Sequence, residues 1–158
     1  MLSWYEIRTK DVVIMRKVIY SLFSFAVVLM VFAACDKESI VSADGLPKDA
    51  QVFIAQHFPD EEIVQVVKER DDLKTTYDVY LGGGFELDFD RKGNITGVEG
   101  TSKLPDSVVP EEILAYVAAN YPDHFIRDWE LDGRGQDVTL SNGMELKFDS
   151  AGNFLRID

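Results

Sequence analysis

The sequence predicts an α+β fold built from two tandem helix-plus-antiparallel-sheet repeats. Three observations support this fold class. Residues 46–100 and 104–158 share short motifs in the same order, each copy starts with apolar residues at helical spacing, and apolar and polar residues then alternate along short segments. We expect one body, with the helices packed on one face of the sheet and the other face open to solvent.

The repeat is seen by aligning the two copies. The matching motifs are Leu46-Pro47 with Leu104-Pro105, 57–60 (HFPD) with 120–123 (NYPD), 77–81 (YDVYL) with 136–140 (QDVTL), 85–90 (FELDFD) with 144–149 (MELKFD), and 93–95 (GNI) with 152–154 (GNF). A period of this length indicates a duplicated supersecondary unit. One unit alone would bury too little surface to be stable, so the two units are expected to share a core.

Each copy is predicted to begin with an amphipathic helix. The apolar stripe consists of Ala50, Phe53, Ile54, His57 and Phe58 in the first copy, and of Leu114, Val117, Ala118 and Tyr121 in the second. Pro110 followed by two glutamates is a favourable helix start. Pro59 and Pro122 are expected to end the helices, because the residue before a proline is disfavoured in the helical region.

Strands are predicted at 77–81 and 85–90, and at the matching segments 136–140 and 144–149. The glycines in 82–84 and 141–143 suit hairpin loops, and 90–94 and 149–153 resemble turns with a bulge. Because Thr96-Gly97 interrupts the pattern after Ile95, the last strand of the first copy is expected to be short.

The N-terminal region has the pattern of a secretory signal. Arg16 and Lys17 precede an uncharged apolar run, 18–34, which ends in small residues before Cys35. We predict a signal peptide over 1–34, with 1–14 a start-site artefact, and lipidation of Cys35 in a lipobox-like sequence. Residues 35–45 would then be a polar tether from the membrane. The alternative is a retained transmembrane helix that ends at an ordinary thiol.

Composition excludes some classes of function. The chain has 158 residues, 28 acidic and 16 basic, and a net charge of −12. This acidity argues against nucleic-acid binding, which needs a basic stripe. Cys35 is the only cysteine, so no internal disulfide can form.

No catalytic residues are predicted. The usual nucleophile, redox, phosphate-binding and zinc motifs are missing from the sequence. The two histidines, His57 and His124, do not have metal-ligand spacing and are assigned structural roles. We therefore expect a protein that is not an enzyme; a carboxylate-only enzyme such as a glycoside hydrolase is the weakest alternative.

One strand face is a candidate binding surface. Period-two alternation places Asp78, Tyr80, Glu86 and Asp88 on the outward face of two neighbouring strands, followed by Asp90. An acidic patch with an aromatic anchor would favour a basic protein or peptide partner. The alternative is an ordinary solvated face. In the second copy the same face has Thr139, Glu145, Lys147 and Asp149, which is less acidic.

A calcium site is a further candidate at Asp88, Asp90 and Asn94, because oxygen ligands suit that ion. The EF-hand pattern is not met, since Lys92 stands at a ligand position and no terminal glutamate follows. Hairpin-turn chemistry is the favoured explanation of these residues. Apart from calcium, no cofactor is expected.

These motifs together resemble the PepSY-like family, also known as beta-lactamase-inhibitor-like, over both copies. The resemblance implies a secreted or periplasmic, non-enzymatic protein of Gram-negative envelopes, but it transfers no inhibitory residues. We expect a lipid-anchored periplasmic or surface binding module, with inhibition of a protein or peptidase partner as one form of this function. The alternative is an envelope protein that responds to calcium or a small ligand.

Overall fold

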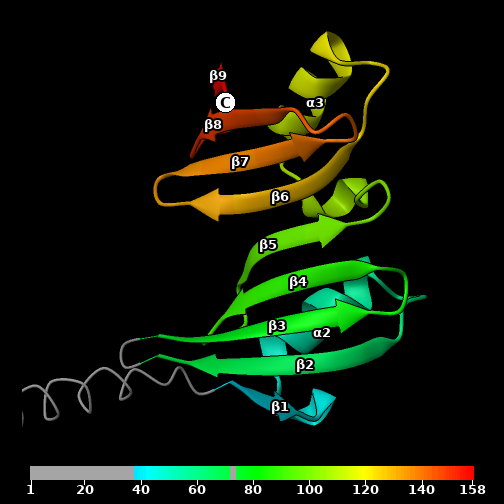
Figure 1. Cartoon of the computed structure of the whole chain (residues 1–158), viewed down its shortest axis with the longest axis vertical. Helices are drawn as coiled ribbons and strands as arrows, with labels where there is room; N and C mark the ends of the chain where they lie inside the picture. The colour runs from blue at the N-terminus through cyan, green and yellow to red at the C-terminus, as the bar shows by residue number, and fades with distance from the viewer. Residues whose placement is uncertain (1–37, 72–73) are drawn as a thin grey trace, which may run out of the picture. The chain divides into compact units, whose positions relative to one another are not determined.

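The computed structural model describes residues 38–71 and 74–158. Nine strands and two ten-residue α-helices follow one another along this part of the chain (Figure 1). In chain order, the elements are β1 (Ser39–Val41), the 3₁₀ turn η1 (Ala43–Gly45), α2 (Lys48–His57), β2 (Ile63–Arg70), β3 (Thr75–Leu81), β4 (Phe85–Asp90), β5 (Ile95–Gly100), the 3₁₀ turn η2 (Asp106–Val108), α3 (Glu111–Asn120), β6 (Ile126–Asp132), β7 (Gly135–Leu140), β8 (Glu145–Asp149) and β9 (Phe154–Ile157).

The nine strands form a single antiparallel sheet in the order β1 to β9. The prediction of an α+β fold made of two helix-plus-sheet repeats is therefore wrong, and the fold is predominantly β. The two copies are not separate sheets, because β5 pairs with β6 through Gly97 opposite Glu130, Val98 opposite Trp129 and Glu99 opposite Asp128. These backbone pairs join all strands into one ladder.

The expected short last strand of the first copy is also wrong. β5 has six residues, and its interruption at Thr96 is a bulge, where the register shifts between Asp88 and Phe89 of β4. The Thr96 hydroxyl donates a hydrogen bond to the Asp88 carbonyl at 3.1 Å. The bulge lets the strand continue to Gly100, so that it is long enough to pair with β6.

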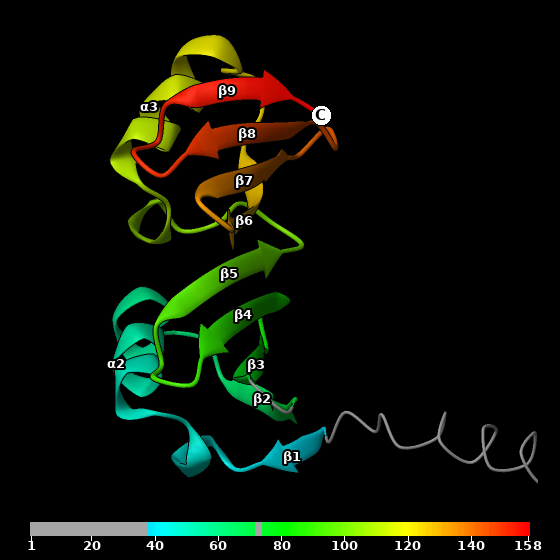
Figure 2. The ribbon, with the colours of Figure 1, turned by 90° about the vertical axis from the view of Figure 1, so that its left-hand side faces the viewer.

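Both helices lie on one face of the sheet, and the core lies between them and the strands (Figure 2). Each helix ends just before the aromatic residue that precedes Pro59 or Pro122. The predicted stripe holds for Ala50, Ile54 and Phe58, which are buried. In α3, however, Ile113 and Val117 are the buried residues and Ala118 is exposed, because the helix is rotated from the expected stripe.

The two predicted bulge turns have the same geometry. The carboxylate of Asp90 accepts hydrogen bonds from the backbone N–H groups of Lys92 and Asn94, and that of Asp149 does so from Ala151 and Asn153. Gly93 adopts a φ of 91°, and a Cβ there would lie 2.7 Å from the backbone nitrogen of Ala50. Glycine is therefore required at this turn for both its backbone conformation and its closeness to α2.

The N-terminal predictions lie largely outside the described residues. The signal peptide and Cys35 cannot be placed, but residues 39–41 of the predicted tether are strand β1, which pairs with β2 from Ser39 opposite Lys68 to Val41 opposite Val66. Within the described residues, neither α-helix is long and apolar enough to span a bilayer.

Candidate functional site

The face of the sheet that points away from the helices is strongly acidic. Inward residues such as Val79, Leu87 and Val98 are buried, so their neighbours along each strand point to the other side. We name as the acidic face a set of seven outward carboxylates on β3 to β7. They are Asp78, Glu86, Asp88, Glu99, Asp128, Glu130 and Asp137.

The register brings these carboxylates together in two rows that cross the strands. One row is Tyr80, Glu86, Glu99, Asp128 and Thr139, and the other is Asp78, Asp88, Gly97, Glu130 and Asp137. Directly opposite residues have Cβ atoms about 4.5–5.5 Å apart, and like charges in such positions are destabilising. The arrangement therefore costs folding free energy, which indicates a role other than stability.

Three carboxyl groups on this face have raised pKa values, because they are partly buried and lie close to other carboxylates. Burial, followed by repulsion from Asp78 and Glu86, raises the pKa of Asp88 to about 6. Burial, with repulsion from Glu69 and Glu86, does the same for Asp78, and burial with repulsion from Glu130 and Glu99 does so for Asp128. The ionised form of these three carboxyl groups is therefore disfavoured, and a nearby cation would stabilise it.

Tyr80 is the aromatic residue at the edge of the acidic face. Its hydroxyl donates a hydrogen bond to Glu86, which together with burial raises the pKa of Tyr80 to about 12. The phenol is therefore uncharged at neutral pH and holds the Glu86 carboxylate in place. The structure thus brings together Asp78, Tyr80, Glu86 and Asp88, the four residues predicted as a binding face.

Gly97 makes room for Asp88 at the centre of this face. A Cβ at position 97 would lie 2.8 Å from Oδ2 of Asp88, so the carboxylate lies directly over the glycine backbone. A side chain at this position would push Asp88 aside. The residue that interrupts the sequence pattern of β5 therefore lets a carboxylate rest in the middle of the sheet.

The outward face of the sheet is less acidic at β7 and β8, where a carboxylate is paired with a lysine. Lys147 forms an ion pair with Asp137, and the hydrogen bond between them raises the pKa of Lys147. A shallow depression of about 110 Å³ lies beside this pair and is lined by carboxylates of β6, β7 and β8. The unpaired negative charge therefore lies over β3 to β6.

Two of the predicted calcium residues lie together in one turn, where the Asp90 carboxylate accepts a hydrogen bond from the Asn94 side chain at 2.8 Å. Asp88 lies two residues earlier on the same outward face of β4, opposite Asp78. Burial acts to raise the pKa of Asp90, but these hydrogen bonds outweigh it and lower the pKa. In the part of the chain that the structure describes, no three acidic, histidine or cysteine side chains are grouped as metal ligands.

Sequence reasoning missed Glu99, Asp128 and Glu130, although they occupy the centre of the acidic face. Their closeness depends on the pairing of β5 with β6, which joins segments that are far apart in the sequence. The only signal in the sequence is the recurrence of acidic residues at alternate positions in Arg127–Asp132. That alternation predicts an outward acidic strand face but not its neighbours.

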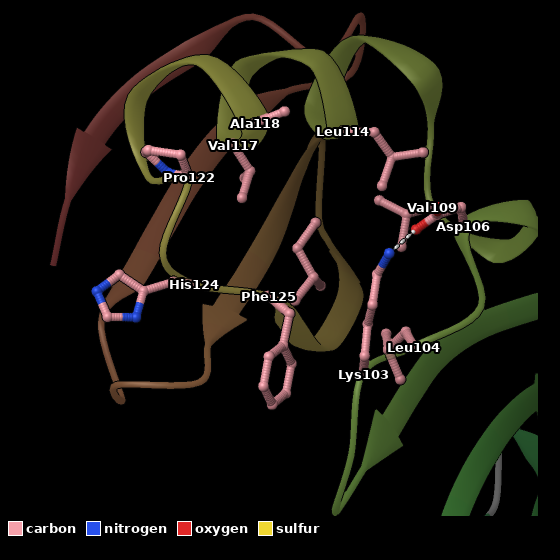
Figure 3. Close-up of a pocket in the computed structure, with 11 residues that line it drawn as sticks. Lys103, Leu104, Asp106, Val109, Leu114, Val117, Ala118, Pro122, His124 and Phe125 are labelled. Atoms are coloured by element: carbon pink, nitrogen blue, oxygen red, sulfur yellow. Dashed lines mark ion pairs between the residues drawn. The ribbon is translucent and has the colours of Figure 1, made fainter.

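A groove of about 360 Å³ lies on the other side of the molecule, between α3 and the start of β6 (Figure 3). Its lining is mostly apolar, with Leu114, Val117 and Ile126 among the residues that form it. Lys103 at its rim is paired with Asp106 at 2.8 Å, so its charge is balanced. His124, also at the rim, contacts Asn142 through Nε2 at 3.1 Å.

Both histidines have structural contacts. His57 Nδ1 lies 2.9 Å from the Ser107 hydroxyl, and its ring packs on Phe53 with the ring centroids 4.4 Å apart. This contact joins α2 to η2, and His124 joins the end of α3 to the turn after β7.

Three solved structures that resemble this chain are described as putative periplasmic proteins of Bacteroides species. A Bacteroides vulgatus protein of the DUF2874 family, described as a "putative periplasmic protein", is 41% identical over 78% of this chain and 98% of its own, with a TM-score of 0.74. A Bacteroides thetaiotaomicron protein, described as a "putative calcium-regulated periplasmic protein", is 36% identical over 77% and 96% of the chains, with a TM-score of 0.74. A second Bacteroides vulgatus protein, of unknown function, is 31% identical over 77% and 99%, with a TM-score of 0.73.

The family model described as "putative beta-lactamase-inhibitor-like, PepSY-like" matches residues 33–96 and 75–156. The chain belongs to this PepSY-like family. None of the curated proteins compared with the chain matches it.

Proposed function

We propose that this protein is a non-enzymatic binding module of the cell envelope, whose acidic face takes a basic segment of a protein or peptide partner. The observation that carries the proposal is that like charges face each other across neighbouring strands: Asp78 lies opposite Asp88 on β3 and β4, and Glu86, Glu99 and Asp128 lie in one row across β4, β5 and β6. Such a surface is costly in the free protein, and a cationic partner would relieve its repulsion. Inhibition of a basic envelope enzyme or peptidase would be one use of this binding.

The proposed location is the periplasmic side of the envelope, with Cys35 lipidated. The periplasmic descriptions of the relatives support an envelope location. The apolar run before Cys35 supports the anchor. The tether would then be short, because Cys35 lies only four positions before Ser39, the first residue of β1. Incorporation of labelled palmitate, lost in Cys35→Ser, tests this anchor.

The binding test uses residues 37–158, which form one compact unit. The solved relatives support this choice, because the matched region makes up 96–99% of their chains. The immobilised protein is incubated with envelope extract of the source bacterium, and the retained protein is purified for a direct titration. Asp88→Lys, at the centre of the face, is expected to weaken binding about tenfold or more, and Tyr80→Ala to weaken it less.

The matched control is Asp123→Lys, an exposed residue in the turn after α3 that changes the net charge by the same amount. Binding should survive this change and weaken as salt is added. Equal retention by wild type, Asp88→Lys and Asp123→Lys would refute the acidic face as the binding surface.

Calcium is the second candidate, favoured by one observation, the description of the Bacteroides thetaiotaomicron relative as calcium-regulated. Asp78 and Asp88, opposite each other, would be its first ligands on the acidic face. A rise in melting temperature with calcium chloride but not with magnesium chloride, absent from Asp88→Asn, would support this function. No difference between the two salts would eliminate it.

A further inference from the structure

Strands β5 and β9 are built alike, but only β5 is covered by a neighbour. Each pairs with the preceding strand through a bulge at the same point, between Asp88 and Phe89 for β5 and between Lys147 and Phe148 for β9. Val98 of β5 is 1% exposed because β6 covers it, whereas Ile157, at the matching position of β9, is 52% exposed. Among the described residues, no strand pairs with the outer side of β9 (Figure 2).

The backbone of β9 is ready to accept a further strand. The N–H of Asp158 donates to the Glu145 carbonyl of β8 at 3.0 Å. Because successive residues of a strand direct their backbone groups to opposite sides, the N–H and C=O of Ile157 point away from β8. An edge of this kind is a template for pairing with another chain.

We propose that β9 pairs with β9 of a second copy of this protein, antiparallel and centred on Ile157. In that register the two Ile157 side chains lie opposite each other. Arg156 of each copy lies opposite Asp158 of the other, so two ion pairs form across a twofold axis. Within one copy, Arg156 already bonds Asp158 at 2.8 Å, which shows that both side chains lie on the same face.

Neighbouring registers are disfavoured. A shift of one residue would place outward side chains opposite inward ones. A shift that centres the pair on Arg156 would set the two arginines against each other. Residues 156–158 of two copies can therefore pair favourably in one register, the one centred on Ile157.

The charge distribution also favours this edge. Lys147 and Arg156 make the β8–β9 end the least acidic part of the open face, and the acidic face over β3 to β7 would stay apart from its counterpart. The opposite edge is less suited, because β1 (SIV) has no charged side chains that could form ion pairs across a twofold axis. The proposed dimer leaves the acidic faces free and does not depend on the proposed function.

Sedimentation equilibrium of residues 37–158 tests the proposal. Wild type is expected to form a reversible, weak dimer, since edge pairing buries little surface. Arg156→Asp and Asp158→Arg should each weaken dimerisation about tenfold, because each homodimer then sets like charges together. An equimolar mixture of the two variants should regain the dimer, because their opposite charges face each other in the mixed pair.

Ile40→Lys, on the exposed side of β1, is the matched control and should leave the dimer constant unchanged. Circular dichroism of each variant verifies that the sheet is intact. A monomeric wild type at high concentration would overturn the proposal, and so would single variants that dimerise like wild type. Failure of the mixture to regain the dimer would also overturn it, since the register would then be wrong.

Discussion

Two halves of the molecule, α2 to β5 and α3 to β9, have hairpins of the same backbone geometry but differ in their surface charge. The hairpins β3–β4 and β7–β8 have the same register, so Asp78 opposite Asp88 corresponds to Asp137 opposite Lys147. The first pair repels, whereas the second is an ion pair. The same hairpin geometry thus holds two repelling carboxylates in the first half and a pair of opposite charges in the second.

The difference shows that the acidic pair is not needed by the fold. A lysine at the position of Asp88 is compatible with this hairpin, because Lys147 occupies the matching position in β8. The fold therefore does not require the two repelling carboxylates of the first half. The interiors differ less, as Phe89 and Phe148 occupy matching positions and both are buried.

The largest expected effect is the loss of either of these phenylalanines. Phe89→Ala and Phe148→Ala should each lower the free energy of unfolding by about 3–5 kcal/mol, through lost burial and the cavity left behind. Phe148→Ala should cost more, because that ring packs edge-to-face against both Tyr116 and Phe154. Urea denaturation followed by circular dichroism measures both. Since the sheet is continuous, a single transition is expected in each, and two separate transitions would mean that the halves unfold independently.

The comparison of halves also shows what the sequence could predict. Alternation along 77–81 and 85–90 identified β3, β4 and their outward face, because a strand has a period of two that is visible locally. The single sheet could not be predicted, since it depends on Val98 meeting Trp129 across 31 positions of chain, and such pairing leaves no local pattern. The acidic face was therefore predicted for two strands, although it continues through Glu99 and Asp128.

A stability effect of intermediate size is expected at the ion pair between Asp137 and Lys147 in the second half. Lys147→Met should lower the free energy of unfolding by about 1–2 kcal/mol, because it leaves the largely buried Asp137 carboxylate without its partner. Thermal and urea unfolding at neutral pH measure this loss. Asp137→Asn together with Lys147→Met should recover most of it. If the double variant is no more stable than Lys147→Met, the cost arises from packing and not from the unpaired charge.

The smallest expected effect, and one of opposite sign, is at Asp88. Its pKa of about 6 in the folded protein exceeds the ordinary 3.8, so between these values the folded state binds more protons than the unfolded state. The contribution of Asp88 to stability therefore falls as pH rises from about 4 to 6 and stays low above. Asp88→Asn removes the buried charge and should raise the free energy of unfolding by about 1 kcal/mol at pH 7, with no gain near pH 4.

Urea denaturation at a series of pH values between 4 and 8 measures this difference as the gap between wild type and Asp88→Asn. Asp149→Asn is the contrasting control, because hydrogen bonds from Asn153 lower the pKa of that carboxyl and its charge is favourable in the folded state. That variant should lose stability at pH 7. If the gap for Asp88→Asn did not change with pH, the repulsion across the first hairpin would be too weak to account for the difference between the two halves.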